Sequence, residues 1–161
     1  MTCMRNFVPL AFMVIVLAIA TPAQAQVNGD EFSGYWKTAE GDGIVQLQKC
    51  AMYKFAPPTA MCGVIVWDVE VNNPKRTLPL DCNRKIFEAT RFENGVWQNG
   101  WAFDTRQKKF YNTKLRMKDG QLRVRVFVGT EVNGETMVFT RVNEVPPGCE
   151  GKQPEVSSVK G

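Results

Sequence analysis

KFYNTKLRMKDGQLRVRVFV, residues 109–128, is the stretch that decides the fold. Apolar and charged side chains alternate along both of its halves, which is the spacing of strands that bury one face. Asp119 and Gly120 separate the halves, and this dipeptide is favoured in tight hairpins because both positions tolerate positive φ. The stretch therefore predicts two antiparallel strands, 109–117 and 121–129, with one apolar face and one charged face.

The two faces of this hairpin follow from the alternation. The expected inward side chains are Tyr111, Thr113, Leu115, Met117, Leu122, Val124, Val126 and Val128. The expected outward side chains form a basic patch of cross-strand neighbours, Lys114, Arg116, Arg123 and Arg125. Such a patch either contacts an anionic component of the cell envelope or only keeps the outer face of the sheet in water.

The same pattern recurs along the chain. Six further strands are expected at 34–38, 43–49, 60–67, 84–92, 96–103 and 135–142. Turn dipeptides at 42–43, 94–95 and 133–134 make neighbouring strands antiparallel. Eight strands in sequential order favour a closed, all-β, antiparallel up-and-down β-barrel over a two-sheet sandwich, because closure removes exposed edges. The long connection 68–83 is the exception, and we expect it to serve as a lid or a contact surface.

The first 25 residues are typical of a cleaved signal peptide. Arg5 precedes an apolar run at 7–20, and the small-x-small segment 23–25 ends the pattern before Gln26. The run has only 14 residues, fewer than the ~20 that a membrane-spanning helix needs. Residues 1–25 therefore predict an exported, periplasmic protein whose mature form has no membrane span.

The remaining 136 residues fit a single domain. We expect a barrel at 26–144 and a loosely ordered tail at 145–161. Removal of the signal peptide takes away one basic and no acidic residue, which leaves 19 basic and 16 acidic residues and a net charge of +3. This balance is too mild to indicate nucleic acid as a partner.

Four cysteines remain in the mature chain, and an even number in an exported protein indicates disulfides. Cys50 and Cys62 flank a short connection between strands that should be neighbours, so their Cα atoms are expected within bonding range. By elimination, the second disulfide is then expected between Cys82 and Cys149. The chain has no histidine and no CxxC spacing, so the cysteines are not expected to form a metal site.

The residue types do not favour catalysis. Without histidine there is no Ser-His-Asp or Cys-His arrangement and no ordinary general base near neutral pH. No glycine-rich loop suited to phosphate is present either. We therefore expect a protein that is not an enzyme and uses no cofactor.

Large side chains on the expected inner faces are the candidates for ligand binding. They are Trp67, Trp97, Trp101, Phe103, Tyr111 and Leu115, with Phe127 beside them. Strict alternation puts Trp97, Trp101 and Phe103 on one face. These side chains either line a cavity for a small apolar or amphipathic ligand or fill the interior, because an eight-stranded barrel is just wide enough to be packed solid. The first case favours a binding protein, and the second favours a structural or interaction module of the envelope.

Short motifs in a fixed order resemble the small exported bacterial proteins known as domain of unknown function 2147. They include GYWKT at 34–38, CGVIVW at 62–67, LPLDC at 78–82, GWAFD at 100–104, LRVR at 122–125 and GETMVFTR at 134–141. This resemblance implies a lipocalin-like barrel in the periplasm and no established activity.

Gly34, Trp36 and Arg141 also resemble the signature of the calycins, in which the tryptophan closes one end of the barrel and the arginine lies across its ring. This resemblance implies that Trp36 and Arg141 are neighbours on the first and last strands. We expect the guanidinium within about 6 Å of the indole centroid, as a cation–π contact requires. Both residues are interpreted as architecture rather than as a ligand site.

Overall fold

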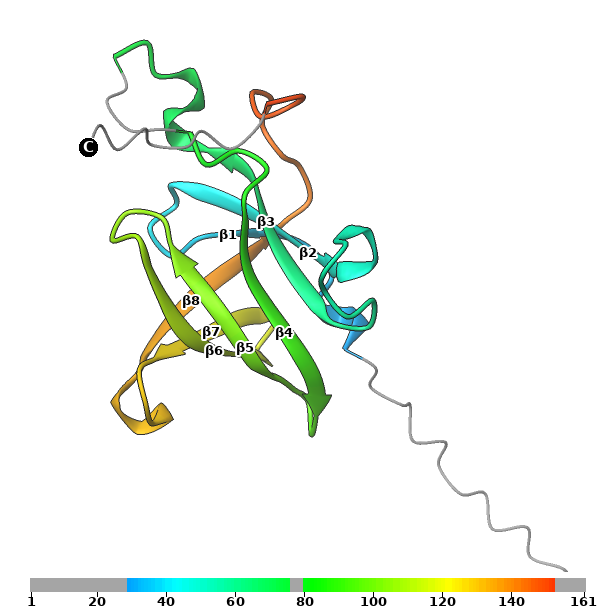
Figure 1. Cartoon of the computed structure of the whole chain (residues 1–161). Helices are drawn as coiled ribbons and strands as arrows, with labels where there is room; N and C mark the ends of the chain where they lie inside the picture. The colour runs from blue at the N-terminus through cyan, green and yellow to red at the C-terminus, as the bar shows by residue number, and fades with distance from the viewer. Residues whose placement is uncertain (1–28, 76–79, 153–161) are drawn as a thin grey trace, which may run out of the picture.

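The described part of the chain contains eight strands and four 3-10 turns. The computed structural model describes residues 29–75 and 80–152 (Figure 1), so the expected signal peptide lies outside the described residues. The strands are β1 (Gly34–Lys37), β2 (Gly43–Lys49), β3 (Met61–Asp68), β4 (Lys85–Glu93), β5 (Val96–Asp104), β6 (Lys109–Lys118), β7 (Gln121–Phe127) and β8 (Glu135–Val142). The 3-10 turns are η1 (Asp30–Phe32), η2 (Cys50–Met52), η3 (Val69–Asn72) and η4 (Glu131–Asn133).

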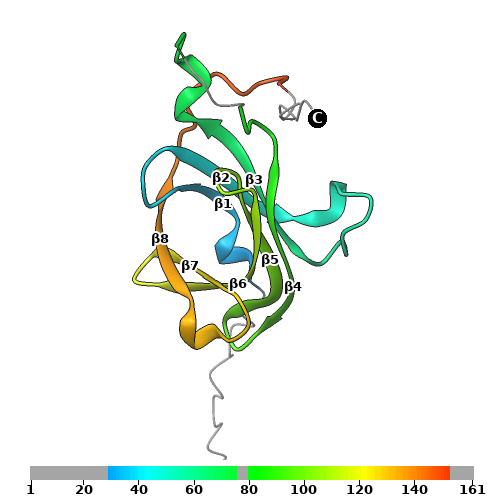
Figure 2. The ribbon, with the colours of Figure 1, turned by 60° about the vertical axis from the view of Figure 1, so that its left-hand side comes forward.

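Each strand pairs with the next, and β1 also pairs antiparallel with β8, so the sheet closes on itself. The predicted eight-stranded antiparallel barrel is therefore confirmed, and each strand begins and ends within two residues of its expected bounds. Figure 2 shows η1 within the ring of strands. In the part of the chain described, no helix is long and apolar enough to cross a membrane.

Trp36 and Arg141 hold the seam between the first and last strands. They are directly paired in the β1–β8 register, and the guanidinium carbon lies 4.2 Å from the centroid of the indole. Trp36 is fully buried, and its Nε1 donates a hydrogen bond to the carbonyl of Phe32 at 2.8 Å. Arg141 donates to the carbonyl of Ser33 at 2.9 Å and to that of Glu31. The expected contact is confirmed, and it also ties η1 into one end of the barrel.

This closed end, which contains η1 and the β4–β5 and β6–β7 turns, is packed with apolar side chains. The ring of Phe32 meets that of Phe92 at 5.9 Å, and Phe92 meets Trp97 at 5.1 Å. Leu115 and Leu122 are fully buried against the same cluster. The closed half of the barrel is therefore a solid core.

A bulge in β5 breaks the expected alternation. Trp97 pairs with Leu115 on β6, but Gly100 already pairs with Thr113, so three steps along β5 match two along β6. Asn99 takes up the extra residue with φ of 55°. The residues after the bulge therefore face the opposite side from the one that strict alternation predicts.

The prediction that Trp97, Trp101 and Phe103 share an inner face is wrong for this reason. Trp97 is buried inside, whereas Trp101 packs against Phe110 at 5.6 Å, and Phe110 is two-thirds exposed on the outer face. Phe103 also contacts Phe110, at 4.8 Å between ring centroids. Val128 lies beyond the end of β7 at Phe127 and is 72% exposed, although it still lines the cavity at the open end of the barrel.

Both expected disulfides are present. Cys50 and Cys62 have Cα atoms 5.1 Å apart, and Cys82 and Cys149 have Cα atoms 5.2 Å apart. Asn83 adds hydrogen bonds from its side-chain amide to the carbonyls of Cys149 and Lys152, at 2.9 and 2.8 Å. The first part of the segment that follows β8 is therefore held against the β3–β4 connection.

Trp36→Ala is expected to reduce the free energy of unfolding by about 3–5 kcal/mol, because it removes a fully buried indole and leaves Arg141 without its ring. Urea unfolding measures the loss. Trp101→Ala is the matched control: its indole packs on the outer face, so its loss should be clearly smaller. Equal losses in the two variants would contradict the closing role of Trp36.

Candidate functional site

The end of the barrel opposite η1 is open. Its rim consists of the β1–β2 loop (38–42), the described parts of the β3–β4 connection (69–75 and 80–84), the β5–β6 turn (105–108) and the β7–β8 loop (128–134). These four segments meet at one end because successive antiparallel strands return to it. Residues 76–79 of the expected lid lie outside the described residues.

A main cavity of about 510 Å³ lies behind this rim. Its apolar walls come from β4 to β8 and comprise Ile86, Phe87, Ala102, Tyr111, Val124, Val126, Phe127, Met137 and Phe139. The ring of Phe87 has room in this wall because it packs against Gly63, where a Cβ would overlap the ring. A concave apolar space of this size is typical of sites that hold small molecules.

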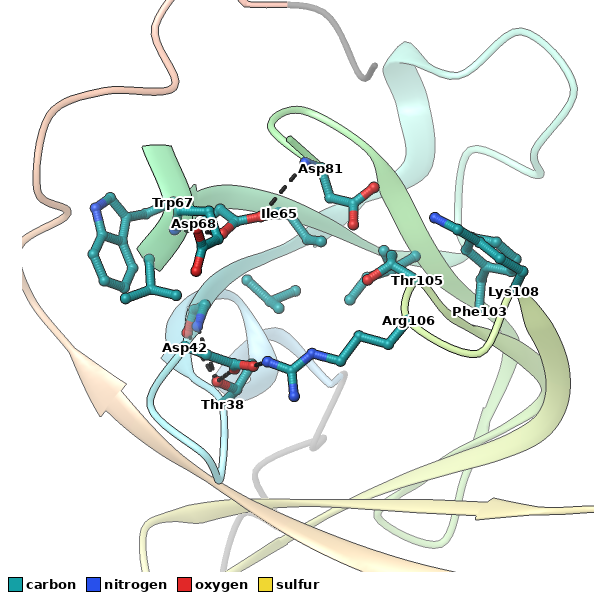
Figure 3. A pocket seen from close by; sticks show the side chains of 15 residues that line it. Thr38, Asp42, Ile65, Trp67, Asp68, Asp81, Phe103, Thr105, Arg106 and Lys108 are labelled. Atoms are coloured by element: carbon teal, nitrogen blue, oxygen red, sulfur yellow. Dashed lines mark hydrogen bonds and ion pairs between the residues drawn. The ribbon is translucent and has the colours of Figure 1, made fainter. Parts of the chain in front are cut away.

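A second cavity of about 470 Å³ lies beside the first, under the β1–β2 and β3–β4 segments (Figure 3). Val45, Ile65 and Ile86 contribute its apolar surface. Its charged lining residues are Asp42, Asp68, Glu70, Asp81, Arg106 and Lys108. Thr38, Ile86 and Phe103 line both cavities, so the two spaces adjoin at the open end of the barrel, which we call the mouth.

An ion pair between Arg106 and Asp42 spans that mouth. Figure 3 shows Arg106 extending from the β5–β6 turn toward Asp42 and Thr38, and its guanidinium donates to Asp42. Thr38 donates its hydroxyl to the other oxygen of Asp42 at 2.6 Å. Asp104 shapes the turn by accepting the backbone N–H groups of Arg106 and Gln107, at 2.9 and 2.8 Å. Loops from opposite sides of the barrel are thereby connected.

The expected ligand-binding residues do not form one cluster. Tyr111 lines the main cavity, Trp67 lines the second cavity, and Phe103 lines both. Trp97 and Leu115 belong to the solid core at the closed end. Trp101 is on the outer face, so it does not belong to the site.

Sequence reasoning missed most of the main cavity wall. Phe87 on β4 and Met137 and Phe139 on β8 line it, although none was a candidate. Met137 and Phe139 are two residues apart on a strand that was expected, so the period of two would have placed both on one face, although the apolar Val138 between them weakens the alternation.

The expected basic patch is present on the outer face, and an acid covers much of it. Lys114 is directly opposite Arg125, and Arg116 is opposite Arg123. Glu131 of η4 accepts from Lys114 and from Arg116, the latter at 2.8 Å.

Hydrogen bonds from Lys114, and next from Arg116, hold the pKa of Glu131 below its usual value. Arg125 adds a bond from its Nη2 to the backbone carbonyl of Glu131 at 2.7 Å. Arg123 differs from the other three, because its Nε is buried and has no hydrogen-bond partner among the described residues.

The carboxylate of Glu88 lies near the sulfurs of Cys50 and Cys62, with the ligand atoms within 4.8 Å of one another. The two sulfurs are joined to each other, so neither is a thiolate that could bind a metal. Lys85 pairs with Glu88 at 2.8 Å. This group is accordingly a structural feature of the outer face.

Glu131→Gln is expected to lower stability at neutral pH by no more than about 1 kcal/mol, because its partners are partly exposed. The folded-state pKa of Glu131 is lowered, so its contribution exists above the ordinary glutamate pKa of about 4.3. It is lost as pH falls through the lower folded-state pKa. Urea unfolding at neutral and acidic pH should therefore show the variant and the parent converging in acid.

Glu144→Gln is the control for this measurement, since it removes the same charge from an exposed position outside the patch. Its stability should differ little from that of the parent at either pH. A Glu131→Gln deficit that stayed constant from neutral to acidic pH would show that the ion pairs are not its cause.

Among solved structures, the chain is similar to protein HP1028 of Helicobacter pylori, which is described as belonging to the lipocalin family, with 13% identity over 70% of this chain and 83% of that chain and a TM-score of 0.49. A search of curated proteins finds no match. A family described as uncharacterized protein conserved in bacteria, DUF2147, matches residues 34–141, which run from the first residue of β1 to Arg141 on β8. The chain therefore belongs to the DUF2147 family.

Proposed function

We propose that this protein is an exported, periplasmic binding protein that holds a small apolar or amphipathic ligand in the main cavity. The observation that carries the proposal is the contrast between the two halves of the barrel. In the closed half the rings of Phe32, Phe92 and Trp97 pack against one another, whereas the open half leaves about 510 Å³ between large apolar side chains. The alternative of a barrel filled throughout would leave no such space.

The walls of the main cavity supply the binding energy in this proposal. Phe87, Val124 and Phe139 are almost fully buried and present apolar surface to its interior. Each methylene of a ligand contributes about 0.8 kcal/mol when it leaves water. A chain of eight to ten carbons therefore reaches micromolar affinity if the costs of immobilising it are modest.

Binding without catalysis is the simpler use of this site. The chain has no histidine, and its four described cysteines are consumed in disulfides. Two disulfides also support export, because they persist in oxidising compartments such as the periplasm. The pattern of residues 1–25 supports the same location.

The β3–β4 connection forms one wall of the mouth in this proposal. Val69 and Glu70 of η3 line the second cavity. The disulfide between Cys82 and Cys149 and the hydrogen bond that Asp68 accepts from the backbone of Glu70, at 2.8 Å, hold the segment in place. The connection therefore limits access from one side rather than filling the cavity.

Ala102→Phe is expected to abolish binding while preserving the fold. Ala102 lines the main cavity, opposite Tyr111 on the neighbouring strand, so a phenyl ring there enters space that is otherwise empty. Added apolar volume in a cavity costs little stability. Titration with the neutral dye N-phenylnaphthylamine, followed by its fluorescence, should give micromolar binding to the parent and none to the variant.

Trp101→Ala is the matched control, because Trp101 directly precedes Ala102 on β5 and faces outward. It should bind the dye as the parent does. Urea unfolding of Ala102→Phe verifies that the fold is retained. Binding that survives in a folded Ala102→Phe variant, or that is lost in Trp101→Ala, would place the dye elsewhere and favour the interaction-module hypothesis.

A further inference from the structure

The described charged residues that line the main cavity all have one sign. They are three carboxylates, those of Glu40, Asp104 and Glu135, and no lysine or arginine of the described part of the chain lines it. Asp104 is occupied by the backbone N–H groups of its own turn. Glu40 and Glu135 are exposed, and neither forms an ion pair with another described residue.

The second cavity has the same bias. Of the residues that the structure describes, two cations line it, Arg106 and Lys108, against four carboxylates. Arg106 is already paired with Asp42. A ligand that enters the shared mouth therefore passes more negative charge than positive charge on either side.

The negative charge at the mouth is opposite in sign to the net charge of the chain. The mature chain carries a net charge of +3, and its basic side chains gather instead on the outer face of β6 and β7. Because the negative charge lies at the mouth and the positive charge on the outer face, a cation is attracted to the mouth and an anion to the outer face. The net positive charge of the chain by itself would attract an anion, so a preference for a cation would have to come from the mouth.

The aromatic walls add a second and independent preference. Phe87, Tyr111, Phe127 and Phe139 line the main cavity below the carboxylates. Aromatic faces attract organic cations through the ring quadrupole, and quaternary ammonium groups are recognised in this way. A positively charged end near the rim and an apolar body below it would satisfy both sets of side chains.

We infer that the ligand of the main cavity is an amphipathic organic cation, with an ammonium group at the Glu40 and Glu135 rim and an apolar body against the aromatic walls. This inference rests on the proposed function, because it assigns the chemical class of the same ligand. A fatty acid or other anion with an apolar tail would instead bring its charge next to three carboxylates.

Three amphiphiles with one tail test the charge preference: decyltrimethylammonium, decyl sulfate and the uncharged decyl glucoside, each below its micelle-forming concentration. Calorimetric titration of the mature protein should rank the cation first and the sulfate last. A charge pair at about 4 Å in a wet site changes an affinity about fivefold, so the cation should bind at least about tenfold more tightly than the sulfate. Added salt should narrow this difference.

The double variant Glu40→Gln/Glu135→Gln identifies the carboxylates responsible. Both residues are exposed, so the fold should be retained. The affinity for the cation should fall about tenfold, whereas the affinity for decyl glucoside should change less than about twofold. The matched double variant Glu31→Gln/Glu144→Gln removes the same net charge from exposed positions that do not line the cavity, and it should keep the preference.

The outcomes separate the two claims. Binding of decyl glucoside with no preference for the cation overturns the inferred ligand class and leaves the proposed function standing. Failure of all three amphiphiles to bind overturns both. A cation preference that survives in Glu40→Gln/Glu135→Gln, or that disappears equally in Glu31→Gln/Glu144→Gln, also overturns the inference, because the rim carboxylates would then not be its source.

Discussion

The seam between β1 and β8 is the constraint on which the rest of the molecule depends. Trp36 buries its indole there, and the guanidinium of Arg141 covers the ring while bonding to the carbonyls of Ser33 and Glu31. These contacts close the sheet and fix η1 in one end of it. A sheet closed at one end by a plug has only one place for an interior cavity, the other end.

The same division explains how one short chain combines stability with an empty space. The closed half buries Phe32, Trp97 and Leu115 in a solid cluster, and the disulfides lie outside the barrel, so neither depends on what occupies the mouth. The open half then tolerates unfilled volume, because the contacts that would fill it are not needed for closure. Arg106 and Asp42 keep the rim in shape across that space.

Local signals made most of the fold predictable from the sequence. Alternating side chains and Asp-Gly or Asn-Gly turns specify strands and antiparallel order within a few residues, and Trp36, Arg141 and the cysteines specify closure. The bulge at Asn99 was not predicted, although Asn99-Gly100 is a signal for it, because asparagine tolerates a φ of 55° and an isolated glycine inside a strand often accompanies a bulge. That single shift moved Trp101 outward. The sequence also left open whether the interior is filled or contains a cavity, because the volume of the cavity depends on how side chains from five strands meet.

Methionine-methyl NMR distinguishes a ligand in the open half of the barrel from one in the closed half, because each half contains a methionine that reports on it. Met137 lines the main cavity, whereas Met61 is fully buried in the closed-end core. On addition of a neutral decyl amphiphile, the Met137 methyl signal should shift and receive magnetisation from the ligand tail, whereas the Met61 signal should stay unchanged. Transfer to neither methyl, or a perturbation centred on Met61, would contradict a ligand site in the open half.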